Sequence, residues 1–98
     1  MAFKVEIDRR VHLEIEQTIG YLVERNFSAA KKLFEILQKT YLNLSKNPYY
    51  QIRYKQIRCI PIKGFPFMFH FSINENTKTV QVHAFIHTAK NPKKNWLK

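Results

Sequence analysis

The hydrophobic pattern along these 98 residues predicts an α+β fold: an N-terminal strand, an antiparallel helical hairpin, and then a three-stranded antiparallel meander. Three observations support this prediction. Apolar residues alternate at the N-terminus, recur at helical spacing over residues 11–44, and alternate again over residues 52–87. This order of elements is typical of a twisted sheet with its helices on one face. The length fits one domain, which we expect to span residues 1–98.

The first strand and the first helix follow from two different spacings of apolar residues. Apolar and charged residues alternate over residues 3–7, which predicts a short strand with one buried face. From Val11 onward, apolar residues recur at steps of three and four, which predicts an amphipathic helix that ends near Arg25. Asp8 precedes this helix and is its candidate N-cap, because a carboxylate can accept from the free backbone N–H groups there.

A second helix follows after a turn at residues 26–28. Its apolar stripe runs from Ala30 to Leu44, and Ser28 is its candidate N-cap. Asn47-Pro48 ends the helix, because proline restricts the residue before it and has no N–H to donate. A short turn between two such helices predicts an antiparallel hairpin.

The remaining elements have the spacing of strands. We expect strands over residues 52–62, 65–73 and 79–87, with a tight turn at Lys63-Gly64 and a polar hairpin loop over residues 74–78. Strict alternation in the last strand places Gln81, His83, Phe85 and His87 on one face, opposite to Val80, Val82, Ala84 and Ile86. The two histidines of this strand are therefore expected on the open face of the sheet.

The middle strand carries four alternating aromatic residues, which are Phe65, Phe67, Phe69 and Phe71. Aromatic side chains interleaved with basic ones can stack on nucleic-acid bases. We interpret these four as the core face under the helices, because no other segment supplies enough apolar surface to cover the hairpin.

The charge is distributed unequally along the chain. Residues 1–50 hold eight Lys/Arg and six Asp/Glu, a net charge of +2, whereas residues 51–98 hold nine Lys/Arg and only Glu75, a net charge of +8. A basic surface with so little counter-charge attracts polyanions. The pattern favours a nucleic acid or an acidic protein segment as partner, and the alternative is a solvated face that aids solubility.

Several classes of protein are excluded by what the sequence lacks. It has no apolar run of the roughly 20 residues that a membrane-spanning helix needs, and charged residues occupy the start, where a signal peptide is apolar. Its single cysteine, Cys59, has no disulfide partner. On one strand His83 and His87 would lie about 13 Å apart, too far to share a metal ion. We therefore expect a cytoplasmic protein with no membrane contact, no metal and no cofactor.

Metal-free cleavage of RNA is compatible with the residues present. That reaction needs a base, an acid and cations that stabilise charge on the phosphate, and imidazole can act as base or acid near neutral pH. The alternative for each histidine is a packed or half-exposed residue of the sheet. Arg58 faces the core side of its strand unless a bulge intervenes, and Trp96 either caps the sheet edge or stacks on a base.

We take three residues as catalytic candidates, namely His87, Lys90 and Arg58. A second group is expected to bind RNA, and its members are Arg53, Lys55, His83, Lys93, Lys94 and Trp96.

Two local patterns make nearly the whole chain similar to a known family. One is Ile57-Arg58 followed by Gly64-Phe65-Pro66-Phe67, and the other is His87-x-x-Lys90-x-Pro92 with Trp96 four residues later. With the order of elements, they resemble the RelE/ParE superfamily of toxins from bacterial type II toxin–antitoxin systems. The resemblance implies a toxin held inactive by an antitoxin, and the basic second half suits an acidic antitoxin segment.

The superfamily divides by target, and the resemblance leaves the target open. RelE-like members cut messenger RNA on the ribosome, and ParE-like members poison DNA gyrase. Lys90 stands at a position that the ribonuclease branch fills with a cation, but Pro66 replaces an arginine and Trp96 replaces a tyrosine. We expect ribosome-dependent mRNA cleavage by a metal-independent endoribonuclease. The alternatives are a non-hydrolytic gyrase inhibitor and a non-toxic binding remnant of the family.

Overall fold

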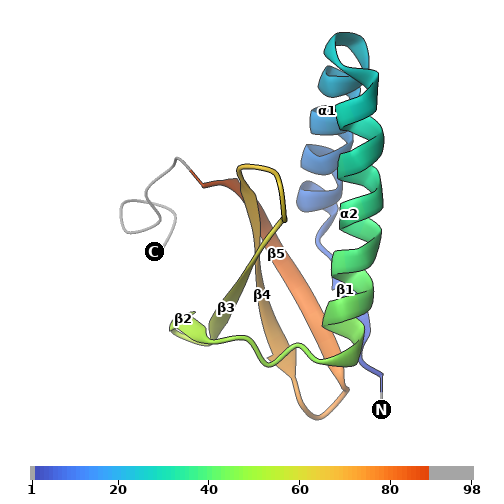
Figure 1. Cartoon of the computed structure of the whole chain (residues 1–98). Helices are drawn as coiled ribbons and strands as arrows, with labels where there is room; N and C mark the ends of the chain where they lie inside the picture. Colours follow the sequence, from blue (N-terminus) through green and yellow to red (C-terminus); the bar gives the residue numbers. More distant parts are fainter. Residues whose placement is uncertain (1, 89–98) are drawn as a thin grey trace.

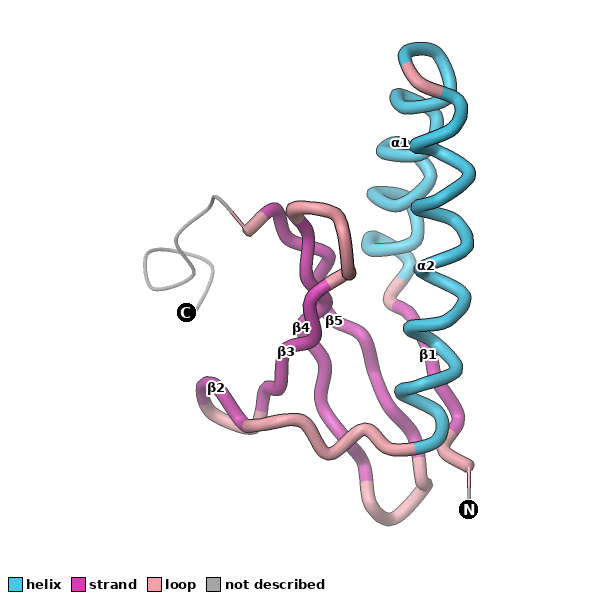
Figure 2. The backbone as a smooth tube through the Cα atoms, in the orientation of Figure 1, coloured by secondary structure: helices cyan, strands magenta, loops and turns pink. Residues whose placement is uncertain are grey.

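The computed structural model describes residues 2–88, which form two helices and a five-stranded sheet (Figure 1). The helices are α1 (Arg9–Arg25) and α2 (Phe27–Lys46). The strands are β1 (Lys4–Ile7), β2 (Ile52–Tyr54), β3 (Ile57–Pro61), β4 (Phe67–Asn74) and β5 (Thr79–His87). Their order in the sheet is β1-β5-β4-β3-β2, and β1 pairs with β5 in parallel while the other neighbours are antiparallel. The predicted α+β class is confirmed, with both helices on one face of the sheet (Figure 2).

The helices begin differently from the sequence prediction. The side chain of Asn26 accepts a hydrogen bond from the backbone N–H of Ala29 at 3.0 Å, so α2 begins at Phe27 and Ser28 lies within its first turn. The prediction of Ser28 as N-cap was therefore wrong. Asp8 stands at the N-cap position of α1 but makes no capping hydrogen bond, because its carboxylate binds side chains of β5 instead. No helix within residues 2–88 is both long and apolar enough to cross a membrane.

The segment predicted as one strand over residues 52–62 forms two strands. A two-residue turn at Lys55-Gln56 joins β2 to β3, and Lys55 has a positive φ of 48°. The turn contains neither glycine nor asparagine, which are the residues that normally indicate such a turn. The next connection does follow its sequence signal, since Gly64 has a φ of 84°.

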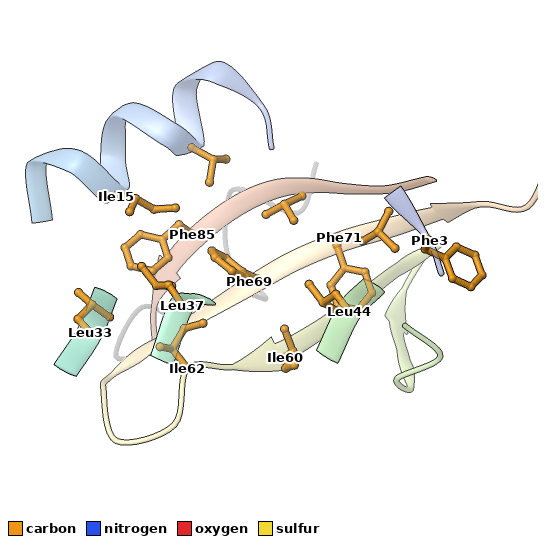
Figure 3. Close-up of a cluster of buried hydrophobic side chains, with 13 residues drawn as sticks. Phe3, Ile15, Leu33, Leu37, Leu44, Ile60, Ile62, Phe69, Phe71 and Phe85 are labelled. Atoms are coloured by element: carbon orange, nitrogen blue, oxygen red, sulfur yellow. The ribbon is translucent and has the colours of Figure 1, made fainter. Parts of the chain in front are cut away.

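The core lies between the helices and the phenylalanines of β4 (Figure 3). Phe69 and Phe71 are completely buried, and from α2 they meet Leu33, Leu37 and Leu44, which are 0–2% exposed. Burial of each such side chain contributes about 1.5–3 kcal/mol to folding. The interpretation of this strand as the core face is therefore confirmed for Phe69 and Phe71.

A bulge in β5 changes which residues face the helices. His70 pairs with Ala84 and the next residue, Phe71, pairs with Val82, so His83 is an extra residue in the ladder. An extra residue shifts the alternation by one position. Val82 before the bulge and Phe85 after it are consequently both buried in the same core.

The two histidines of β5 therefore lie on opposite faces of the sheet. His83 remains on the face away from the helices, whereas His87 pairs with Phe67 and contacts its ring edge-on at 5.4 Å on the helix side. The predictions that His83 and His87 share the open face, and that Ala84 and Ile86 share the face of Val80 and Val82, were wrong. Strict alternation cannot anticipate a bulge.

The core predicts a large difference between two phenylalanine substitutions. Phe69→Ala should lower the free energy of unfolding by about 3–5 kcal/mol, because it leaves a cavity under α2. Phe27→Ala is the matched control, since that side chain is 68% exposed and should change stability by less than about 0.5 kcal/mol. Urea unfolding followed by circular dichroism measures both, and equal losses would contradict this description of the core.

Candidate functional site

The face of the sheet away from the helices carries two groups of polar side chains. One group is half hidden and consists of Tyr54, Cys59 and His70. The other is more exposed and consists of Asp8, Ser72, Gln81 and His83. No described helix covers this face (Figure 1).

The half-hidden group is centred on His70. Its Nδ1 atom lies 3.3 Å from the Cys59 sulfur and 3.4 Å from the Tyr54 hydroxyl, and its side chain is only 2% exposed. Burial, with a smaller contribution from the charge of Arg53, lowers the pKa of His70 to about 4. Burial also raises the pKa of Cys59, and raises the pKa of Tyr54 to about 12. All three groups are therefore uncharged at neutral pH.

The exposed group connects three segments of the chain. The Ser72 hydroxyl lies 2.7 Å from Nε2 of His83, and Nδ1 of the same ring lies 3.7 Å from an Asp8 carboxylate oxygen. The Gln81 side-chain amide donates a hydrogen bond to the other Asp8 oxygen. The separation between Nδ1 of His83 and the Asp8 oxygen is longer than that of a direct hydrogen bond.

Strand pairing explains why these residues meet. In the parallel pair of β1 and β5, Ile7 lies opposite Val82, and the backbone N–H of Asp8 donates to the Val82 carbonyl at 3.1 Å. Asp8 is thus held beside the bulged residue His83. Ser72 is paired with Gln81 in the next strand, which brings its hydroxyl to the other side of the imidazole.

Hollows in the surface adjoin both groups. A hollow of about 250 Å³ is lined by both histidines of this face, His70 and His83, together with Tyr54 and with Arg10 and Glu14 of α1. A larger groove of about 1040 Å³ begins at Ser72 and His83 and extends over the hairpin loop between β4 and β5. His83 lines both, so it is accessible to a ligand from either side.

The residues proposed from the sequence are distributed over different parts of the structure. Arg58 lies on the helix side, where its guanidinium donates to the Tyr50 carbonyl at 2.5 Å and its charge lies 5.4 Å from the centre of the Tyr49 ring. The core-side alternative for Arg58 is therefore the one observed. His87 also lies on the helix side.

The other proposed residues are either exposed near the open face or not described. Arg53 and Lys55 are exposed on β2 and its turn, and the charge of Arg53 acts on His70 and Cys59. Four proposed residues lie outside the described residues, and these are Lys90, Lys93, Lys94 and Trp96. Of the five proposed residues that the structure describes, His83 is the one placed within 2.7 Å of Ser72 and 3.7 Å of Asp8 on the open face.

Sequence reasoning missed Asp8, Ser72, Gln81 and His70 as members of this surface. Asp8 was predicted to be a helix N-cap. Ser72, Gln81 and His70 have the spacing of ordinary polar residues in alternating strands. The only available signal was the polar character of alternate residues facing away from the phenylalanines of β4.

Comparisons with known proteins establish the fold. No protein-family model and no curated protein sequence matches the chain. Among solved structures, the chain is similar to a mutant of the E. coli toxin RelE in its free state, with 12% sequence identity and a TM-score of 0.63. The match covers 95% of this chain and 90% of that one. The protein therefore has a RelE-like fold.

The environment of His70 predicts a loss of stability in mild acid. The ordinary pKa of histidine is 6.5, so between about pH 6.5 and 4 the unfolded chain binds a proton that folded His70 does not. The free energy of unfolding should therefore fall as pH decreases through this range, by up to about 3 kcal/mol at about 1.4 kcal/mol per pKa unit.

Urea unfolding at pH 7 and pH 4.5 measures this loss in the wild type and in His70→Gln. The variant should lose less stability between the two pH values, because its amide does not titrate. His12→Gln is the control, since His12 is exposed on α1 and its replacement should leave the pH dependence of the wild type. Identical pH dependence in the wild type and in His70→Gln would contradict the assigned environment.

Proposed function

We propose that this protein is a toxin of a type II toxin–antitoxin system that inhibits translation by cleaving messenger RNA on the ribosome. One observation carries the proposal: the open sheet face presents an accessible imidazole, His83, held between a hydroxyl and a carboxylate. The RelE-like fold and the basic second half of the sequence support it. In this proposal the open face is the surface that meets the RNA.

The residues around His83 suit a phosphodiester substrate. Arg10 shares a hollow with His83, and Arg53 and Lys55 are exposed on the β2–β3 hairpin. Cations near the reacting phosphate stabilise the charge that develops during cleavage. The reaction proposed here uses only protein side chains and no metal ion or cofactor.

The proposed partner that controls the toxin is an antitoxin with an acidic segment. Residues 51–98 have a net charge of +8. An acidic segment bound there would lower the repulsion among these basic side chains and would cover the face that meets RNA. The same charge favours association with the ribosome, which is a polyanion.

A gyrase inhibitor is the second candidate. It is favoured by the positions of Arg58 and His87, because two of the three proposed catalytic residues lie on the helix side rather than on the open face. An inhibitor that acts by binding requires no catalytic group, and Pro66 and Trp96 depart from the ribonuclease pattern.

A cell-free translation reaction tests the proposed function directly. Adding the purified chain should produce new mRNA 5′ ends within codons on ribosome-bound message, and primer extension maps them. The same message without ribosomes is the control and should stay intact. A supercoiling assay with DNA gyrase, run in parallel, should show unchanged activity.

Two results would contradict ribosome-dependent cleavage. Intact message with inhibited supercoiling would establish the gyrase alternative instead. Intact message with normal protein synthesis and normal supercoiling would leave a binding protein without toxic activity.

A further inference from the structure

We propose that His83 is the general base of the open face, that Asp8 positions it, and that the Ser72 hydroxyl occupies the place of the RNA 2′-hydroxyl. This inference rests on the proposed function and names the residues that perform its chemistry. It moves the catalytic role from His87 to His83. It also adds Asp8, which the sequence indicated as a helix N-cap, and Ser72, for which the sequence indicated no role.

The environments of the four histidines favour His83 over the others. His12 lies on α1 and pairs with Glu16, in a groove between the two helices. His87 contacts Phe67 on the helix side. His70 faces the same hollow as His83, but burial lowers its pKa to about 4, which makes it a weak base. His83 alone combines exposure on the open face with a carboxylate on one ring nitrogen and a hydroxyl on the other.

The arrangement defines which nitrogen accepts a proton. The Asp8 carboxylate, 3.7 Å from Nδ1, favours the tautomer with its proton on that nitrogen. Nε2 then carries the lone pair, and the Ser72 hydroxyl donates to it at 2.7 Å. A hydroxyl within 3.2 Å of the lone pair has the geometry that general-base catalysis requires. The donor in this structure belongs to the protein, and an RNA hydroxyl at the same place would be activated in the same way.

The carboxylate of Asp8 is itself held in place. The Gln81 amide donates to one of its oxygens, and its backbone N–H donates to Val82. A carboxylate held beside Nδ1 keeps the ring in the orientation that directs Nε2 toward the Ser72 hydroxyl. Asp8 acts through His83 and does not reach the substrate, so we describe it as a positioning residue.

The chemical step follows from these positions. His83 takes the proton of the 2′-hydroxyl, the 2′ oxygen forms a bond to phosphorus, and the bond from phosphorus to the 5′ oxygen breaks. The 5′ oxygen takes a proton from water, and the hydroxide so formed receives the proton held by His83. The products are a 2′,3′-cyclic phosphate and a 5′-hydroxyl, with no net gain or loss of protons.

Charged groups of both signs surround this position. From α1, Arg10 and Glu14 line the hollow beside His83, and from β1, Lys4 and Glu6 line the groove on its other side and pair with each other at 3.2 Å. Within residues 2–88, Arg10 has no acidic side chain at ion-pair distance, so its guanidinium is the candidate phosphate ligand.

The test uses ribosome complexes that carry a defined mRNA, with toxin in excess, so that one cut per complex is followed. The rate at saturating toxin reports chemistry, and the half-saturating toxin concentration reports binding. His83→Ala should lower the saturated rate by about 10²–10⁴-fold with little change in the half-saturating concentration. His83→Gln keeps a hydrogen-bonding group beside Ser72 but cannot take up a proton, so it should show the same loss.

Asp8→Asn tests the positioning role. It should lower the saturated rate by up to about 10²-fold and leave the half-saturating concentration unchanged. In a His83→Ala background it should have no further effect, because the two residues act as a unit. A merely structural role for Asp8 would instead lower activity in both backgrounds.

Matched controls come from the helix surface. His12 and Glu16 form an exposed histidine–carboxylate pair at 3.2 Å, so His12→Ala and Glu16→Gln remove the same kinds of group far from the open face. Both should cut at the wild-type rate. Circular dichroism and thermal unfolding of every variant verify that each remains folded.

Three outcomes would overturn parts of the argument in distinguishable ways. Wild-type rates from folded His83→Ala or His83→Gln would overturn the inference and leave the proposed function intact. Loss of cutting in Ser72→Ala would also overturn the inference, because a hydroxyl that only occupies the substrate's place is dispensable. Absence of cuts by the wild type itself would overturn both the proposed function and this inference.

Discussion

A single extra residue in β5 determines how both faces of the sheet are used. His83 interrupts the pairing with β4, so Val82 and Phe85 point into the same core although they are three positions apart. Without this bulge, strict alternation would direct Phe85 toward the open face and Ala84 toward the helices. The ring of Phe85 would then lose its contacts with the rings of Phe67 and Phe69. The same interruption leaves the His83 imidazole outside the core and 2.7 Å from Ser72. Packing on one face and the polar group on the other therefore depend on the same irregularity.

The remaining geometry of the open face comes from the parallel pairing of β1 with β5. The connection between these two parallel strands runs through the helical hairpin and then through β2, β3 and β4, and the hairpin covers only one face of the sheet (Figure 2). Asp8 lies at the end of β1, where its backbone N–H continues the ladder to Val82. Its carboxylate is thereby directed across the sheet to Gln81 and His83 and is not used to cap α1.

Two histidines on one face illustrate how environment separates their chemistry. His70 is 2% exposed and packed against Tyr54 and Cys59, so burial lowers its pKa to about 4 and keeps the imidazole neutral. His83 is exposed, and a carboxylate approaches one of its ring nitrogens. Burial disfavours a charged imidazole, so His70 is a weak base, whereas the exposed His83 ring is open to a substrate. The proposed division of roles, a structural His70 and a reacting His83, follows from this contrast and needs no difference in residue type.

The sequence alone determined the class of fold and its elements, except that residues 52–62 form two strands where it indicated one. Alternating phenylalanines indicated the core strand, and the stripe that includes Leu33, Leu37 and Leu44 indicated the helix above it, because apolar periodicity reflects local geometry. Only the tertiary structure decided the site. The bulge at His83 and the contact between Asp8 and His83 depend on pairing between separate segments of the chain, for which local patterns carry no signal. The turn at Lys55 is local, but it lacks the glycine or asparagine that would have indicated it. His87 was expected on the open face from strict alternation, and the ladder directs it to the helix side instead. Arg58 was taken as catalytic from residue type and motif, and it lies on the core side that alternation indicated.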